Sequence, residues 1–325
     1  RGVQFRRFGM AFRECVGNIG GKDENGKEVG QIKSFKALAT ALSSCVGNGN
    51  IVGIAAAIAI GGPGAIFWMW VASLLGMATK FSEVCLAMHY RIQDEAGNFR
   101  GGVMYILSRG MKNKTLGKIL GGAFAVFTVM VSFISCGALQ ANTIANSLNG
   151  ETGIGIPLWV VAIVVLVLDG LVVCGGLKKI ANVTTVLTPV MALIYIGFSL
   201  IIIILHANMI PTAIYYVVKS AFTGDAAVGG VAGATMAFAI QKGVSRGVFS
   251  NEAGIGSSAI VHATAIVDKP TRQSLYGIIE VFFDTMVICT VTSLLILTTG
   301  VWNSGVTDGT ALASMAFQMN FGSFG

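Results

Sequence analysis

Long apolar segments alternate with short polar ones along most of this chain. An α-helix needs roughly 20 apolar residues to cross a bilayer, and most of these segments qualify. Runs of this kind predict membrane-spanning helices and argue against the short alternating strands of a membrane β-barrel. The expected spans cover residues of about 37–60, 63–89, 119–148, 157–177, 184–206, 226–243, 273–300 and 310 onward.

Two of the expected spans contain residues that weaken a helix. The first carries Gly-Asn-Gly-Asn at 47–50, and the sixth, 226–243, is short and rich in glycine. A second apolar piece, 253–267, follows the sixth span after a polar hinge. Free backbone groups are costly in lipid unless they line a cavity, and paired interrupted helices indicate the binding site of a secondary transporter. We therefore expect a transporter whose substrate binds where the two interruptions meet.

Composition supports a membrane protein. Apolar residues make up 54% of the chain and charged residues only 11%, with a mean hydropathy of +0.75, whereas soluble domains carry about 25% charge. The cations behind the net charge of +7 stand between the spans, so they predict topology and not a nucleic-acid partner. The six cysteines are scattered, and we interpret them as small apolar residues.

The positive charges fall almost entirely on one side of an alternating path. If residues 1–36 are cytoplasmic, the cytoplasmic segments hold twenty Lys and Arg, the outer segments hold only Lys219, and Lys80 lies within the second span. Cytoplasmic loops are enriched in Lys and Arg. We therefore expect a multi-pass protein of the cell membrane (plasma or inner membrane) with a cytoplasmic N-terminal segment.

Several stretches of the chain resemble the alanine or glycine:cation symporter family. They are GGPGAIFWMW and the residues after it at 61–83, RGVFSNEAGIGS at 246–257, and FDTMVICT at 283–290. The resemblance implies uptake of alanine, glycine or a similar amino acid coupled to Na⁺, or in some members to H⁺, with no cofactor besides the co-transported ion. It also implies the inverted-repeat fold of the bacterial leucine transporter.

The expected fold is therefore an all-α polytopic membrane protein with a leucine-transporter-like inverted 5+5 repeat and discontinuous helices 1 and 6. The chain starts at Arg1 and ends inside an apolar stretch, so we expect it to be truncated at both ends. The expected divisions are a cytoplasmic segment 1–36 and a transporter domain 37–325, made of a first repeat 37–206 and a partial second repeat 226–325.

A zwitterionic amino acid in mid-membrane needs donors for its carboxylate. No Arg lies within an expected span, so we expect the carboxylate to bind backbone N–H groups of Asn48 and Gly49, at the start of the second half-helix, beside a metal ion. Gly49 permits close approach of the substrate, with helix packing as its alternative role. Carbonyls released around Ser43, Cys45 and Val46 are candidates to bind Na⁺.

Four further side chains are candidates to act on the ion or on a gate. The resemblance to the leucine transporter makes Asn50 a candidate Na⁺ ligand, and its alternative role is to cap the second half-helix. Asp284 is ionisable and lies inside a span, where it can favour Na⁺ or pair with Lys80. Lys80 and Glu83 lie on one helix face, so they either neutralise each other or act in a cytoplasmic gate.

The sixth span is expected to form the second wall of the site. Phe238 would cover the substrate side chain, Gln241 would bond its polar groups, and Gly243 would allow close approach; a Phe facing lipid or the core is the alternative. The family resemblance makes Gln140 a substrate-binding candidate within a Gln-x-Asn pattern. Gln140 and Asn142 can instead join helices by hydrogen bonds.

Two other classes of function are disfavoured. A channel would need a filter such as Thr-Val-Gly-Tyr-Gly, and no such motif is present. An enzyme would need a nucleophile with a base or a metal cluster, and Glu252 with His262 is too weak a pattern for a metal site. We expect a secondary symporter that takes up alanine or glycine with Na⁺, and a proton-coupled transporter of the same fold as the alternative.

Overall fold

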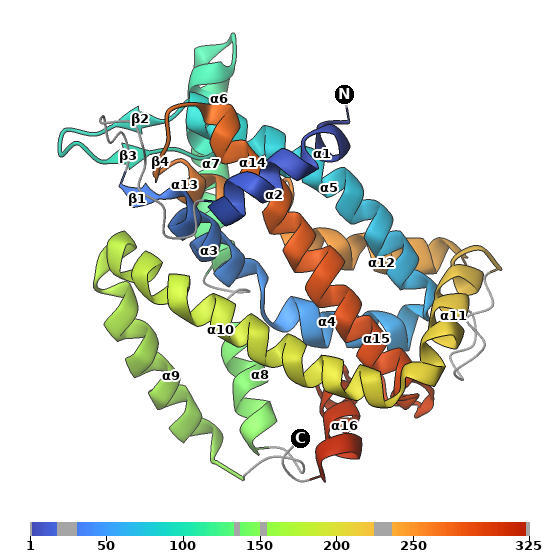
Figure 1. The fold of residues 1–325 in the computed structure, drawn as a ribbon. Helices are drawn as coiled ribbons and strands as arrows, with labels where there is room; N and C mark the ends of the chain where they lie inside the picture. The colour runs from blue at the N-terminus through green and yellow to red at the C-terminus, as the bar shows by residue number, and fades with distance from the viewer. Residues whose placement is uncertain (1, 18–30, 133–136, 150–154, 224–235, 323–325) are drawn as a thin grey trace.

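The computed structural model describes residues 2–17, 31–132, 137–149, 155–223 and 236–322, and nearly all of them are helical (Figure 1). Five helical segments in these ranges are long and apolar enough to cross a bilayer, and a shorter apolar helix, α9 (Leu158–Val173), accompanies them. The prediction of an all-α polytopic membrane protein is therefore confirmed. The five segments are Ser34–Gly61, Gly64–His89, Lys114–Val131, Gly176–Leu205 and Pro270–Thr298.

The first of these segments is interrupted where the sequence predicted. Helix α3 (Ser34–Cys45) ends before Val46, and α4 (Asn48–Gly61) begins after Gly47. Val46 and Gly47 have non-helical backbone angles. At its far end α4 stops at Gly62, which has a positive φ of 74°, and Pro63 leads into α5 (Gly64–His89).

The middle of the chain forms helices that flank the body of the protein. The expected span 119–148 corresponds to α7 and α8, which lie on either side of residues outside the described ranges. The expected fifth span, 184–206, corresponds to α10, which begins earlier, at Gly176, and includes the two lysines at 178 and 179 in its first turn. The elements are α6 (Val103–Gly110), α7 (Lys114–Val131), α8 (Gly137–Asn149), α9, α10 (Gly176–Leu205), the short 3-10 turn η2 (Ala207–Met209) and α11 (Ile210–Thr223).

The second interrupted helix breaks later than the sequence predicted. Helix α12 (Met236–Asn251) continues well past residue 243, and α13 (Ser257–His262) follows it. The break coincides with three positive φ angles, at Glu252, Gly254 and Gly256. The earlier part of the expected span, 224–235, lies outside the described residues.

The last part of the chain forms one long helix and a shorter one. Helix α14 (Pro270–Val281) continues through a π-helical segment, η3 (Phe282–Cys289), into α15 (Thr290–Thr298). The 3-10 turn η4 (Val301–Asn303) leads to α16 (Gly309–Phe321).

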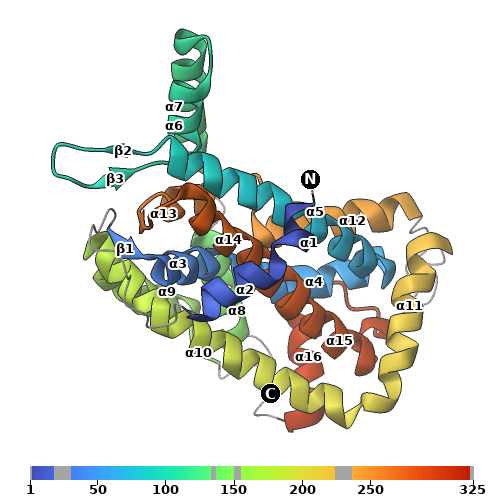
Figure 2. The same cartoon turned by 45° about the horizontal axis from the view of Figure 1, so that its top comes forward.

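Short strands and N-terminal helices gather at one end of the molecule (Figures 1 and 2). Helix α2 (Phe8–Gly17) packs on α14, where Arg272 pairs with Glu14, and α1 (Val3–Arg6) packs on α2 and α5. Strand β1 (Ile32–Lys33) runs parallel to β4 (Ala265–Ile266), and β2 (Ile92–Gln93) forms a hairpin with β3 (Phe99–Arg100).

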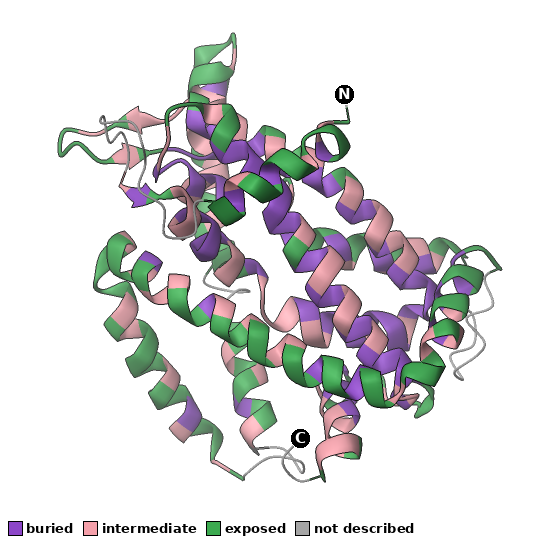
Figure 3. Ribbon diagram, viewed as in Figure 1, coloured by how far each residue is buried: buried purple, intermediate pink, exposed green. Residues whose placement is uncertain are grey.

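The buried core follows α4, α5, α12 and the α14–α15 helix, whereas α9 and α10 present mostly exposed residues (Figure 3). The exposed residues are apolar, as in Leu166 at 73% and Leu193 at 70% exposure. An apolar outer surface of this kind is expected where lipid is the solvent. The two interrupted helices lie inside, against α5 and α14.

Candidate functional site

The junction between α3 and α4 is held open by hydrogen bonds of its own. The Asn50 Oδ1 atom accepts a bond from the Gly47 N–H at 3.2 Å, and the Asn50 N–H donates to the Gly47 carbonyl at 3.1 Å. Asn50 therefore caps α4, the alternative role considered for it. The first N–H groups of a helix have no acceptor within it, so α4 presents Asn48 and Gly49 as donors, and the last carbonyls of α3 around Ser43 and Cys45 are released in the same way.

A cavity of about 300 Å³ adjoins the start of α4. The Asn48 N–H donates to Gln140 Oε1 at 3.4 Å, and Asn48 Nδ2 donates to Thr143 Oγ1 at 2.8 Å. A Cβ added at Gly47 would lie 3.0 Å from Gln140 Nε2, so this backbone approaches α8 closely. Helices α4, α8, α10 and α16 enclose the cavity, whose lining includes Asn48, Gln140, Thr143, Tyr195, Ser314 and Phe317.

On its other side, the start of α4 packs against the end of α12. A Cβ added at Gly49 would meet the Phe249 ring at 3.6 Å and Ser250 Cα at 3.8 Å. Gly49 thus serves helix packing in this structure. The wall opposite α4 is formed by Phe249 and Ser250, six and seven residues beyond the end of the expected sixth span.

A buried carboxylate lies next to this junction. Asp284 is fully buried in the π-helical segment η3 and accepts bonds from Asn50 Nδ2 at 2.6 Å, Ser250 Oγ at 2.6 Å and Thr285 Oγ1 at 3.0 Å. Among the described residues no Lys or Arg forms an ion pair with it; Lys80 instead pairs with Glu280. The alternative pairing of Asp284 with Lys80 is therefore wrong. Burying a charge without a counter-charge is costly, and three hydrogen-bond donors offset only part of that cost.

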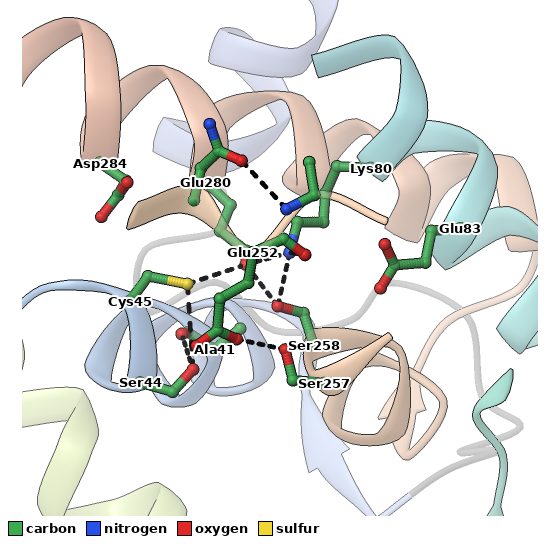
Figure 4. A network of polar contacts seen from close by, with 12 residues as sticks. Ala41, Ser44, Cys45, Lys80, Glu83, Glu252, Ser257, Ser258, Glu280 and Asp284 are labelled. Carbon is green, nitrogen blue, oxygen red and sulfur yellow. Dashed lines mark hydrogen bonds and ion pairs between the residues drawn. The ribbon is translucent and has the colours of Figure 1, made fainter. Parts of the chain in front are cut away.

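A second polar network lies one helical turn away, around Glu280 (Figure 4). Lys80 Nζ lies 3.2 Å from Glu280 Oε1, and both side chains are fully buried. Ser258 Oγ donates to the same carboxylate at 2.6 Å, and His262 Nε2 lies 2.9 Å from its other oxygen. The thiol of Cys45, at the end of α3, lies 3.7 Å from Glu280 Oε1. This network therefore joins α3, α5, α13 and α14.

The break between α12 and α13 is bound by α5. The Gly254 N–H donates to Glu83 Oε2 at 2.8 Å, and Lys80 Nζ donates to the Glu252 carbonyl at 3.3 Å. The Glu252 side chain accepts a bond from Ser257 across the break. Lys80 and Glu83 form no direct ion pair with each other, because each contacts a different partner across the interface.

Three residues predicted for the second wall lie elsewhere. A Cβ added at Gly243 would lie 2.1 Å from the Ala65 carbonyl, so Gly243 is a close-packing residue between α12 and α5. Gln241 is exposed, and Phe238 stacks with the Lys242 ammonium at 4.9 Å. The sequence analysis ended the helix too early, because it took the charged residues after Gln241 as a loop. In the structure they are part of α12.

The sequence analysis also missed Glu280, Ser250 and Thr285. Glu280 stands four residues before Asp284, inside the same apolar run, and an ionisable residue at membrane depth is a functional candidate by default. That signal was available. The contact of Ser250 with Asp284 was not, because Ser is common in membrane helices and α12 is distant in sequence. Thr285 directly follows Asp284, but its position alone does not show that its hydroxyl bonds the carboxylate.

Comparison with known proteins places this arrangement in a family. The family described as the sodium:alanine symporter family matches residues 1–325. The chain belongs to this family. The family resemblance predicted from the sequence is confirmed, and the family consists of transporters, not enzymes.

Individual members of the sodium:alanine symporter family show the range of relatives. The chain is 44% identical over 309 residues to an uncharacterized transporter of Haemophilus influenzae, covering 95% of this chain and 66% of the relative. It is 41% identical over 300 residues to the sodium/alanine symporter AgcS of Methanococcus maripaludis, covering 91% and 65%. It is 37% identical over 293 residues to the probable sodium/glutamine symporter GlnT of Bacillus subtilis, covering 90% and 59%. The chain spans about two thirds of the length of the first two relatives and less of the third.

Proposed function

We propose that the protein of which this chain is part takes up alanine or glycine together with Na⁺. The observation that carries the proposal is the start of α4, an interrupted helix whose first N–H groups adjoin a cavity of about 300 Å³ with Gln140 and Thr143 in its lining. A half-helix N-terminus beside a cavity in mid-membrane suits the carboxylate of an amino acid. AgcS, named as a sodium/alanine symporter, supports the choice of substrate and ion.

In this proposal the cavity beside α4 binds the amino acid. The N–H groups of Asn48 and Gly49 bind its carboxylate, and the amide oxygen of Gln140 exchanges its bond to the Asn48 N–H for one to the substrate ammonium. Tyr195 and Phe317, from α10 and α16, narrow the cavity. Their bulk favours a small side chain.

The Na⁺ ion binds at Asp284 in this proposal. The carboxylate supplies the charge, Ser250 and Thr285 supply hydroxyl oxygens, and Asn50 supplies its amide oxygen after releasing Gly47. Hard oxygen donors of this kind suit a hard cation. The carbonyls of Ser43, Cys45 and Val46, at the end of α3, are further proposed ligands.

Asn50 offers a physical route for coupling. Its amide oxygen caps the half-helix that would bind the substrate, and its amide nitrogen bonds the carboxylate that would bind the ion. An ion at Asp284 would reorient Asn50 and release its bond to Gly47. The N–H groups at the start of α4 would thereby become oriented to bind the carboxylate of the amino acid. By linkage, substrate would raise the affinity for Na⁺ by the same factor.

The remaining parts of the proposal concern the complete transporter. They are a five-plus-five inverted repeat, alternating access, a cytoplasmic N-terminal segment and a location in the cell membrane. Lys80 and Glu83 hold the break between α12 and α13, which supports a role for both in a gate. Proton coupling is the second candidate, because a proton can neutralise the buried Asp284 as a sodium ion can.

Counterflow in proteoliposomes tests the proposal. Proteoliposomes that contain the complete protein are loaded with unlabelled alanine. Entry of radiolabelled alanine, glycine or glutamine is then measured with Na⁺ or choline outside, at two pH values. We expect alanine and glycine to enter only with Na⁺. Equal entry in choline would refute sodium coupling, and entry that follows the pH gradient would establish the proton alternative.

A further inference from the structure

A second cavity, of about 570 Å³, lies at the end of the protein that carries the strands. The β2–β3 hairpin forms one wall and the turn between α9 and α10 forms another. Both views of the fold place this turn beside β1 and the hairpin (Figures 1 and 2). None of the residues proposed to bind alanine or Na⁺ lines this cavity.

The cavity is basic. Arg100, from the hairpin, and Lys178, from the first turn of α10, line it from two different walls, and both are exposed. In the described part of the chain, Lys178 forms no ion pair within 4.0 Å, and Arg100 pairs with Asp94 at 2.9 Å while 62% of its side chain remains exposed. The Asn98 N–H and the Arg100 guanidinium lower the pKa of Asp94. With two cations, Arg100 and Lys178, and one carboxylate, Asp94, the cavity has an excess of positive charge.

The remaining lining is amphipathic. Gln31 and Thr264 supply polar groups, whereas Met104, Leu177 and Ile260 supply apolar surface. Such a mixture fits a ligand that combines a charged group with hydrocarbon, and it is unlike the purely polar lining that a free inorganic ion needs.

An apolar groove begins at the next residue of α10. This groove, of about 420 Å³, starts at Lys179 and is lined further along the helix by Val183, Val186, Leu187 and Val190. The nearby end of α9 also exposes apolar side chains, with Leu171 and Val173 each at 61%. On α10, the lining of the basic cavity thus ends at Lys178 and that of the apolar groove starts at the next residue.

We propose that this basic cavity binds the phosphate head group of an anionic phospholipid, with one acyl chain along the groove of α10. Arg100 and Lys178 contact the phosphate, and Gln31 and Thr264 bond the polar part of the head group. Basic pockets on the cytoplasmic side of membrane helices bind anionic head groups in this way. The proposal rests on the proposed orientation, in which these residues face the cytoplasmic leaflet, and not on the transport activity.

A bound lipid would join parts of the fold that lie far apart in the sequence. The hairpin follows α5, while α10 starts more than seventy residues later. One phosphate between Arg100 and Lys178 would hold the hairpin against the α9–α10 turn. We therefore expect lipid binding to raise the thermal stability of the whole protein.

Lipid binding to the purified complete protein tests the proposal. Phosphatidylglycerol, phosphatidylcholine or inorganic phosphate is added in detergent micelles, and the thermal midpoint and the lipid retained in native mass spectrometry are measured. Of the three additives, we expect only phosphatidylglycerol to raise the midpoint of thermal unfolding and to remain bound in native mass spectrometry. An equal effect of phosphatidylcholine or of inorganic phosphate would overturn the proposal, because either result would remove the need for an anionic lipid.

Charge variants locate the site. Each cation near a lipid surface contributes about a fivefold change in affinity, so Arg100→Gln with Lys178→Gln should weaken phosphatidylglycerol binding roughly 25-fold on the same basis. The matched control is Lys112→Gln with Lys118→Gln, which removes two exposed cations outside the cavity and should leave binding unchanged. Asp94→Asn should tighten binding, since it frees Arg100. Unchanged binding in the first double variant would overturn the proposal.

Discussion

Lys80 Nζ and Glu280 Oε1 lie 3.2 Å apart, and neither side chain is exposed to solvent. The pair links α5 to α14 directly beside the break between α12 and α13, whose Glu252 carbonyl accepts a further bond from Lys80. A buried ion pair in this position holds the second interrupted helix to its neighbours. The pair is therefore one of several contacts at this break, together with the bond from the Gly254 N–H to Glu83.

Removing one member of this pair should destabilise the protein more than removing both. Lys80→Met or Glu280→Met leaves a buried group unpaired, at a cost of about 3–5 kcal/mol. Lys80→Met combined with Glu280→Met should recover much of that loss. Thermal unfolding of the complete protein in detergent measures the effect, and additive losses in the double variant would show that the two charges do not interact.

Asp284→Asn should abolish the dependence of alanine binding on Na⁺. The carboxylate is fully buried and, among the described residues, has no cationic partner, so its charge is the feature that favours a cation. Coupling of this kind typically amounts to about 5–150-fold in affinity, and we expect it to be lost. The control is Asp169→Asn, an exposed aspartate of α9. Retained sodium dependence in the Asp284 variant would place the ion elsewhere.

Gln140→Ala should weaken alanine binding by about 10- to 150-fold, because a hydrogen bond to a charged group contributes about 1.5–3 kcal/mol. The neighbouring Asn142→Ala is the control, since Asn142 is exposed on the same helix and does not line the cavity. Isothermal titration calorimetry of the complete protein in saturating Na⁺ measures the alanine affinity of both variants. Equal losses in both variants would indicate damage to α8 and not the loss of a substrate contact.

Gly243→Ala should impair folding, whereas Gly170→Ala should not. The added methyl at 243 would lie 2.1 Å from the Ala65 carbonyl, but the one at 170 would meet nothing within 4 Å. Overpacking usually costs about 1–3 kcal/mol, and contact with rigid backbone puts Gly243→Ala at the upper end. Size-exclusion profiles and thermal midpoints report the difference. A normally folded Gly243→Ala protein would contradict close packing of α12 on α5.

The thiol of Cys15 should react much more slowly than that of Cys174. Burial beneath α14 raises the pKa of Cys15 to about 11, so at pH 8 only about one thiol in a thousand is the reactive thiolate. Cys174 is exposed at the α9–α10 turn. Maleimide labelling of versions that keep a single cysteine measures both rates. The Cys15 rate should still be rising tenfold per pH unit at pH 9 to 10, and a plateau below pH 9 would contradict its burial.

Much of the fold followed from the one-dimensional pattern. The apolar runs predicted the membrane-spanning helices, and Gly47 with its neighbouring asparagines predicted the interruption between α3 and α4 to within two residues. Both are local properties, since hydropathy and helix-breaking residues act where they stand. The second break was placed too early, because Lys242 and Arg246 look like the end of a span but lie within α12.

What the sequence by itself determined is that the chain is an all-α polytopic membrane protein, where its first long apolar segment is broken, and to which family it belongs. Only the tertiary structure decided which polar residues meet: Asp284 with Asn50 and Ser250, and Lys80 with Glu280. The physical reason is geometric. A hydropathy pattern reports how deep a residue lies in the bilayer, but the partner of a buried charge depends on how each helix is rotated about its axis and on which helices pack beside it.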